Sequence, residues 1–282
     1  MLTAVQANIE GFSAEEMKTF VISMAGAHHR RNRMRALLAS MGVAFEFVDG
    51  IDGRTLPDAE IRKFSFHQEI KLGRGELGCL LSHASIWKRM AADPACELAL
   101  ILEDDVHFSP GFGGLLANIR VDPDAIGLYR LETMLASVNI SRRPRQAVGK
   151  YRVHKLLSTH AGTAAYIVNR KTAAHLSACY LSMRRAVDIE LFSPERRTIG
   201  PIDVYQCVPA PCMQDMKFPA SQQNAHLRSN ITEEREDIAM GIFRREPDFI
   251  KLIKALLRPV YLKIFSLGLI ARGMMRVQVK FD

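Results

Sequence analysis

The sequence lacks several features that mark large classes of protein. No run reaches the roughly 20 apolar residues that a membrane-spanning helix needs, and the longest uncharged stretch towards the C-terminus covers only residues 264–271. The five cysteines are odd in number and scattered, and no second close pair or group of histidines completes a zinc-binding pattern. No internal repeat or low-complexity tract is visible. These absences disfavour a membrane-spanning protein, a disulfide scaffold, a zinc domain and a solenoid.

Two further absences concern phosphate binding and secretion. No glycine-rich GxxxxGK[ST] loop is present, which argues against a phosphotransferase or hydrolase that cradles phosphate in such a loop. The first residues, MLTAVQANIEGF, have neither a basic start nor a long apolar core, so we expect no secretory signal. Scattered cysteines suit reduced thiols. Together these features predict a cytoplasmic protein.

Acidic residues are rare in the last part of the chain, and this explains most of the net charge of +8. Seven basic residues and no acidic one lie between Lys251 and Phe281, whereas residues 1–250 hold 31 basic and 29 acidic residues. A nucleic-acid-binding protein spreads its basic residues over a docking face. A balanced main part with a basic end therefore predicts no nucleic-acid partner.

The basic end has the pattern of an amphipathic helix. Lys251, Lys254 and Arg258 share one helical face, and apolar residues occupy the opposite side. We expect residues 249–280 to contact an anionic membrane surface, which would place the protein peripherally on the inner face of the cytoplasmic membrane. The alternative is that this helix packs on the main domain or across a dimer; the oligomeric state is left open.

Strand and helix patterns alternate along the rest of the chain. The β-branched run TFVISM (19–24) predicts a buried strand, the periodic segment 25–42 a helix, and VAFEFVD (43–49) a second strand. Further helix and strand patterns lie at residues 75–93, 97–104, 159–170 and 171–183. This order predicts an α/β fold. We expect an N-terminal extension (1–18), one main domain (19–230) and a basic helical tail (231–282).

Three adjacent carboxylates, Glu103, Asp104 and Asp105, follow the strongest strand pattern, LALIL (98–102). In open α/β sheets, ligands bind outside the carboxyl ends of the strands. If the backbone stays extended, Glu103 and Asp105 point to one side and Asp104 to the other. Oxygen ligands without a nearby cysteine favour Mg²⁺ or Mn²⁺. The triplet thus predicts a divalent metal site that assists departure of a phosphate or diphosphate; a solvated turn is the alternative.

Several stretches together resemble glycosyltransferase family 25, the bacterial lipooligosaccharide biosynthesis transferases. The resemblance covers roughly residues 19–225 and rests above all on GELGCLLSH (75–83) followed by ILEDDV (101–106). It implies transfer of a hexose, commonly galactose, from a nucleotide sugar, expected to be UDP-linked, to a lipid-linked saccharide. It also implies a GT-A fold, a Rossmann-type domain in which Glu103 and Asp105 hold the metal, and reaction with inversion.

The first strand–helix junction fits the nucleotide donor of such an enzyme. Ser23 lies at the strand end and Arg30, Arg31 and Arg33 follow it, so these residues are candidates for contacts with uridine and pyrophosphate. Residues 30, 31 and 33 spread around a helix, so not all three arginines can face one ligand. Asp49 is a candidate for ribose or base contact, and a turn-forming role is equally compatible with VDGIDG.

Three more candidates complete the donor site. Glu76 and His83 are nearly two helical turns apart and share one face; Glu76 also suits a helix start, and a half-buried histidine also suits a structural role. Asp104 is expected to hold backbone or ribose.

For the catalytic base we favour Asp203, in a Pro/Gly-rich stretch expected to form a loop, with Glu190, Asp188 and finally Glu132 as alternatives. A non-catalytic protein that binds a saccharide or nucleotide at the membrane surface is the alternative function.

Overall fold

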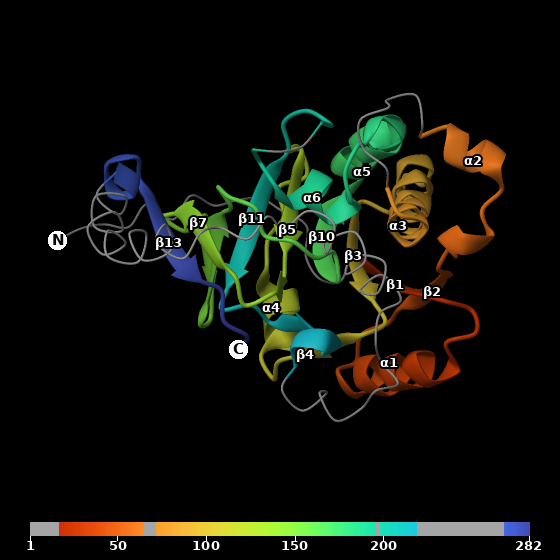
Figure 1. Ribbon diagram of the computed structural model, residues 1–282. Helices are drawn as coiled ribbons and strands as arrows, with labels where there is room; N and C mark the ends of the chain where they lie inside the picture. The colour runs from red at the N-terminus through yellow and green to blue at the C-terminus, as the bar shows by residue number, and fades with distance from the viewer. Residues whose placement is uncertain (1–16, 65–71, 196–197, 219–267) are drawn as a thin grey trace, which may run out of the picture.

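The computed structural model describes residues 17–64, 72–195, 198–218 and 268–282 (Figure 1). Its centre is an eight-stranded mixed sheet with the order β2-β1-β3-β10-β5-β11-β9-β8. The strands are β1 (Met17–Ser23), β2 (Glu46–Asp49), β3 (Leu98–Glu103), β5 (Gly127–Arg130), β8 (Gln146–Val148), β9 (Tyr151–Lys155), β10 (Ala165–Asn169) and β11 (Asp203–Val208). Strands β1, β2 and β3 are parallel, and β10 runs antiparallel between β3 and β5. The predicted α/β class is confirmed, and the central sheet is mixed.

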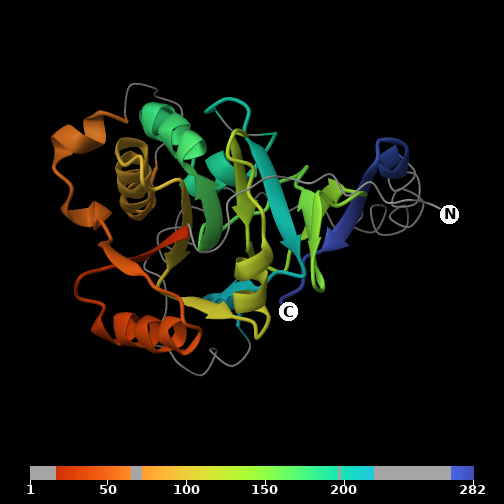
Figure 2. The ribbon, with the colours of Figure 1, turned by 180° about the vertical axis from the view of Figure 1, so that it is seen from behind.

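Helices cover both faces of this sheet (Figures 1 and 2). The bounds are α1 (His28–Ser40), α2 (Asp58–Arg62), α3 (Arg74–Ala92), α4 (Phe112–Asn118), α5 (Arg170–Cys179) and α6 (Val187–Phe192), with single 3₁₀ turns at Gly53–Thr55, Tyr180–Ser182 and Asp215–Lys217. One core cluster joins the sheet to α3, α5 and α6 through Trp87, Tyr166 and Phe192. The other joins it to α1 and α4 through Met34 and Phe112. The sheet is therefore buried on both faces, as its near-continuous apolar strands require.

Two small sheets extend the central one. The first has the order β4-β12-β6, formed by Val106–Phe108, Cys212–Gln214 and Glu132–Thr133. The second pairs β13 (Met274–Gln278) with β7 (Ser137–Ser141) in antiparallel register. Both bring late residues of the chain back to segments that follow β3 and β5.

The C-terminal strand β13 corrects part of the expected helical tail. Met275, Val277 and Val279 alternate with polar residues, and this two-residue period suits a strand that pairs at an edge. Val279 is fully buried, and its N–H donates to the carbonyl of Ala136. The amphipathic segment at 249–258 lies outside the described residues, as does most of the N-terminal extension. No helix among the residues described is long and apolar enough to cross a bilayer.

Candidate active site

A pocket of about 170 Å³ opens at the carboxyl end of β3. Its walls come from the start of α3, the turn after β3, the loop before β10, α6 and the segment around β12. The lining residues are Glu76, Cys79, Glu103, Asp105, Met134, Ala161, Gly162, Thr163, Ala186, Val187, Asp188, Gln214 and Met216. Four of them carry carboxylates, so the pocket is acidic. It lies where ligands bind in α/β sheets.

The acidic triplet forms a turn, which corrects the expected extended geometry. Strand β3 ends at Glu103, and Asp104 and Asp105 make the turn that leads into β4. Glu103 and Asp105 nevertheless both line the pocket, while Asp104 points towards β1. The tight turn crowds three carboxylates together, so neighbouring side chains have to compensate the repulsion between them.

Glu103 accepts hydrogen bonds from two side chains and lies close to a third, that of His83. Its Oε1 accepts a hydrogen bond from the Thr163 hydroxyl at 2.6 Å, and its Oε2 accepts one from the Gln214 amide at 3.4 Å. Nε2 of His83 lies 3.6 Å from Oε1. Burial raises the pKa of Glu103, but His83, Thr163 and Gln214 together outweigh burial and lower this pKa. Glu103 is therefore held as a carboxylate.

Asp105 is less well compensated. It is buried, and its Oδ1 has no hydrogen-bond partner among the described residues. Burial, followed by the negative charges of Glu103 and Asp104, raises the pKa of Asp105 well above its usual value. A buried carboxylate oxygen without a donor, beside a second carboxylate, fits a hard cation such as Mn²⁺ or Mg²⁺ because these ions prefer oxygen ligands.

Asp104 joins the acidic turn to the strand–helix junction at Ser23. The hydroxyl of Ser23 donates to Oδ2 of Asp104 at 2.6 Å, and the Arg30 guanidinium contacts Oδ1 at 3.1 Å. Arg33 reaches the same turn and donates to the carbonyl of Val106 at 2.9 Å. The sequence-predicted residues Ser23, Arg30, Arg33 and Asp104 therefore do lie together.

Arg31 turns to the neighbouring strand instead. It donates to the carbonyl of Ser23 at 2.8 Å and forms an ion pair with Asp49, whose side chain is 71% exposed. The three arginines thus divide between two strand ends, as their spacing on α1 requires. The first turn of α1 contains no acidic residue, so the positive end of the helix dipole adds to their charge.

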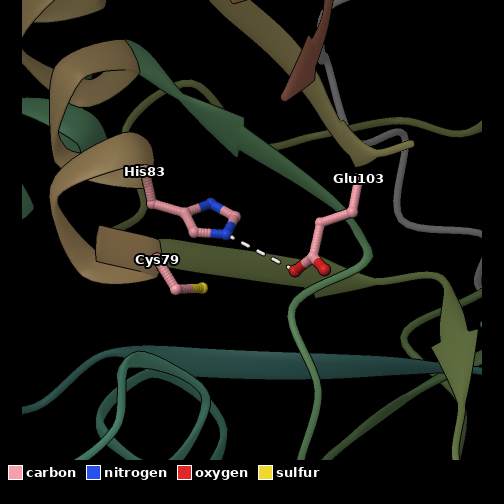
Figure 3. Close-up of side chains that lie close together, drawn as sticks. All are labelled: Cys79, His83 and Glu103. Carbon is pink, nitrogen blue, oxygen red and sulfur yellow. Dashed lines mark ion pairs between the residues drawn. The ribbon is translucent and has the colours of Figure 1, made fainter. Parts of the chain in front are cut away.

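The first part of α3 supplies two of the lining side chains, Glu76 and Cys79. The Glu76 carboxylate accepts a hydrogen bond from the Gly73 N–H at 3.1 Å, which helps to cap the helix. Cys79 and His83 are one turn apart on this helix and face Glu103 (Figure 3). One ligand atom from each of these three residues lies within 4.8 Å of the others, so they are the described group best placed for a softer metal ion.

The predicted catalytic acids have very different positions. Asp188 lines the pocket, where its Oδ2 accepts a hydrogen bond from the Gly162 N–H at 3.1 Å. Glu190 is fully buried, and its carboxylate accepts hydrogen bonds from the backbone N–H groups of Arg184, Arg185 and Thr198 and from the Thr198 hydroxyl. Glu190 therefore holds a loop together.

Asp203 is not brought to the pocket. It begins strand β11, and it pairs with Gly127 at the start of β5. The register through β10 puts this level with Leu98 at the start of β3, five residues or about 17 Å along the strand from Glu103. Asp203 is partly exposed and forms an ion pair with Lys155 at 2.7 Å. The expected loop is a strand, and this strand keeps Asp203 away from the acidic turn.

Sequence reasoning missed a buried ion pair behind the pocket and ranked its acid last. Arg130 and Glu132 are both fully buried, with Nη2 and Oε1 3.1 Å apart. Burial raises the pKa of Glu132 to about 7, although Arg130 opposes this. Gly162 has φ +102°, and an added Cβ would lie 2.7 Å from Glu132 Oε1. The only signal was a pair of charged residues, Arg130 and Glu132, two positions apart in the apolar strand pattern LYRLE (128–132).

An α/β sheet with an acidic pocket beside an arginine-rich helix start is typical of an enzyme that binds a phosphorylated substrate at the strand ends. The comparison with protein families gives the particular class. The model described as "Glycosyltransferase family 25 (LPS biosynthesis protein)" matches residues 16–191. The chain belongs to glycosyltransferase family 25 and is a glycosyltransferase. The resemblance found in its sequence is confirmed.

Curated relatives share much of the chain. The lacto-N-neotetraose biosynthesis glycosyltransferase LgtE of Neisseria gonorrhoeae is 30% identical over 240 residues, 78% of this chain and 82% of that protein. The lipooligosaccharide biosynthesis protein lic2B of Haemophilus influenzae is 26% identical over 265 residues, 87% of this chain and 95% of that protein. A shorter match, 38% identical over 117 residues, covers 38% of this chain and 20% of the human protein described as inactive glycosyltransferase 25 family member 3.

A more distant likeness is found among solved structures. A glycosyltransferase involved in glycosylation of the major capsid of PBCV-1 aligns over 75% of this chain and 98% of that chain. The TM-score is 0.39 and the sequence identity is 11%.

Proposed function

We propose that the protein transfers a hexose, in the first instance galactose, from a UDP-linked donor to a lipooligosaccharide or related saccharide, with metal assistance and inversion. One observation carries the proposal: at the end of the acidic turn (Glu103–Asp105), Asp105 is buried with one oxygen that has no hydrogen-bond donor among the described residues, and it lines the pocket together with Glu103. The names of the relatives in Neisseria and Haemophilus support the choice of acceptor. A GT-A arrangement of the domain belongs to the same proposal.

The donor diphosphate is assigned to the junction between the acidic turn and α1. Arg30 and Arg33 supply positive charge there, and Ser23 and Asp104 fix the geometry of the turn. Glu103 and Asp105 would hold Mn²⁺ or Mg²⁺. A bound divalent cation supplies charge neutralisation for the departing diphosphate. The arginines at the helix start would thus bind the negative diphosphate directly, and the acidic turn would bind it through the cation.

Asp188 is the acid best placed to act as base. An inverting transferase needs one carboxylate to remove the proton from the acceptor hydroxyl as the sugar is displaced. Asp188 lines the same pocket as Glu103 and Asp105, and the Gly162 N–H fixes one of its oxygens. Glu76 caps α3 and Glu132 is paired with Arg130, so both have other tasks.

A panel of UDP-sugars with Mn²⁺ tests the proposal, with UDP release and thermal stability as readouts. We expect one donor to raise the melting temperature and to release UDP only in the presence of a saccharide acceptor. Asp105→Asn should abolish the Mn²⁺-dependent shift, whereas Asp124→Asn, an exposed acid remote from the pocket, should keep it. Stabilisation without UDP release would support the non-catalytic alternative. An unchanged response of Asp105→Asn would refute the metal site.

We also propose that the protein docks peripherally on the anionic inner face of the cytoplasmic membrane. The support is the excess of basic residues after residue 250 and the lipid-linked nature of the proposed acceptor. Each basic side chain near an anionic leaflet contributes about 1 kcal/mol to binding.

A further inference from the structure

Three buried side chains, Trp87, Tyr166 and His83, form a hydrogen-bonded chain that ends beside the acidic turn. The indole Nε1 of Trp87 is 3.0 Å from the hydroxyl of Tyr166, and this hydroxyl is 3.0 Å from Nδ1 of His83. Trp87 and Tyr166 are fully buried and His83 is 1% exposed. The hydrogen bonds are thus shielded from water, so each donor among these side chains needs an acceptor within the protein.

The donor and acceptor roles in this chain have one consistent arrangement. Indole N–H is only a donor, so the Tyr166 oxygen accepts from Trp87. Burial raises the pKa of Tyr166 well above its usual value, so the hydroxyl keeps its proton. Its other hydrogen-bond partner is Nδ1 of His83, which therefore accepts this proton. A His83 ring that carries a single proton would consequently have it on Nε2.

Nε2 of His83 faces the acidic turn. Nε2 has no hydrogen-bond partner in the part of the chain that the structure describes, and Oε1 of Glu103 lies 3.6 Å away (Figure 3). We propose that the Trp87–Tyr166–His83 chain locks His83 as the Nε2–H tautomer, and that His83 is a positioning residue whose N–H holds the Glu103 carboxylate ready for its cation. This inference rests on the proposed metal-dependent transfer.

The direction of these hydrogen bonds also decides whether Cys79, His83 and Glu103 can bind a metal ion together. A metal ion bound to Nε2 would need the opposite tautomer, with the proton on Nδ1. The Tyr166 hydroxyl would then face two donors and lose the one acceptor that the described part of the chain gives it, and a buried donor without an acceptor is unfavourable. The hydrogen-bond chain therefore selects oxygen-based metal binding at Glu103 and Asp105 over a softer site that includes His83.

The tautomer can be measured without metal, sugar or turnover. In protein labelled with ¹⁵N-histidine, long-range ¹H–¹⁵N correlation spectra distinguish a proton on Nε2 from one on Nδ1. We expect His83 to carry it on Nε2. Tyr166→Phe should give a mixture of tautomers, whereas Tyr205→Phe, which removes a hydroxyl on the opposite face of the sheet, should leave the His83 signals unchanged. A proton on Nδ1 in the unaltered protein would overturn the inference.

Metal affinity tests the proposed role of His83 in positioning Glu103. Mn²⁺ binding, followed by electron paramagnetic resonance of the free ion, should weaken about 10- to 100-fold in His83→Leu, the usual effect of losing a partner that orients a metal ligand. His83→Gln keeps an N–H near the position of Nε2 and should bind within a few-fold of the unaltered protein. Equal affinity of His83→Leu and the unaltered protein would refute the positioning role. If the unaltered protein bound no Mn²⁺, the proposed function would fail while the tautomer result would stand.

Discussion

Asp188 and Asp203 were both candidates for the catalytic base, and the fold places only Asp188 at the pocket. Asp188 lines the pocket, whereas Asp203 begins β11 near the other end of the sheet. Asp188→Asn keeps the side-chain volume and one acceptor oxygen but removes the carboxylate that we propose as the base. We expect kcat to fall by about 10²- to 10⁴-fold, the usual contribution of a general base, with donor KM little changed. Steady-state kinetics with the donor found in the UDP-sugar panel measures this.

Asp203→Asn is the matched comparison. This partly exposed residue pairs with Lys155, and such surface pairs contribute little to stability. Its kcat should stay within a few-fold of the unaltered protein. A large loss in Asp203→Asn together with normal turnover in Asp188→Asn would reverse the assignment.

Buried His160 gives the molecule a predictable sensitivity to acid. Burial, helped by the positive charge of Arg130, lowers the pKa of His160 to about 2. The unfolded chain takes up this proton below about pH 6.5, while the folded protein does not, so stability falls as the pH decreases from 6.5. At pH 5 the loss from this residue amounts to about 2 kcal/mol.

Denaturant unfolding at pH 7 and pH 5 measures this loss. His160→Asn retains a donor for Gln206 but cannot titrate, so its free energy of unfolding should depend less on pH by that amount, although it is lower at both values. The same pH dependence in both proteins would contradict the prediction.

At the scale of elements, glycines set how closely α3 approaches the segment after β2. A Cβ on Gly78 would lie 2.4 Å from the carbonyl oxygen of Ile51 and 2.6 Å from the nitrogen of Gly53. These are backbone atoms, so the helix would have to move. Overpacking of this kind costs about 1–3 kcal/mol. We therefore expect Gly78→Ala to lower the melting temperature, measured by calorimetry.

Gly114 in α4 is the control for this substitution. An added Cβ meets nothing within 4 Å there, and alanine favours a helix over glycine by roughly 0.5–1 kcal/mol. Gly114→Ala should thus leave the melting temperature equal or higher. If both variants lost the same stability, close packing of α3 would not be the cause.

At the scale of the whole molecule, the end of the chain is part of the catalytic domain. Strand β13 pairs with β7, the Thr133 hydroxyl donates to the carbonyl of Val279, and the Asp282 N–H donates to the carbonyl of Ala210 at 3.0 Å. Deletion from residue 249 onwards would remove these contacts along with the basic segment. The proposed membrane contact therefore has to be tested by substitution.

Replacement of Lys251, Lys254 and Arg258 by glutamine should weaken binding to anionic vesicles by about 100-fold, since three charges near the surface are worth about 3 kcal/mol together. Co-sedimentation with phosphatidylglycerol vesicles at low salt measures the effect. A triple variant with the same change of charge on the main domain, Arg54→Gln, Arg62→Gln and Lys63→Gln, should bind normally. Equal loss in both variants would mean that net charge alone governs adsorption.

The sequence by itself determined the α/β class, the first strands and helices and the acidic end of β3, because these depend on local patterns. Apolar runs specify strands, a 3.6-residue period specifies helices, and the carboxylates of Glu103–Asp105 directly follow the central strand. The motifs around residues 75–83 and 101–106 determined the family for the same reason: they are contiguous.

Only the tertiary structure decided which distant residues meet. Local composition suggested a loop at Asp203, yet pairing with β5 and β9 makes it a strand and fixes Asp203 at the wrong end of the sheet. Pairing with β7 likewise makes a strand of Met274–Gln278. The contact of His83 with Glu103 and the burial of Glu132 also arise between segments far apart in sequence. Strand register and packing set these distances, and no local pattern of residues encodes them.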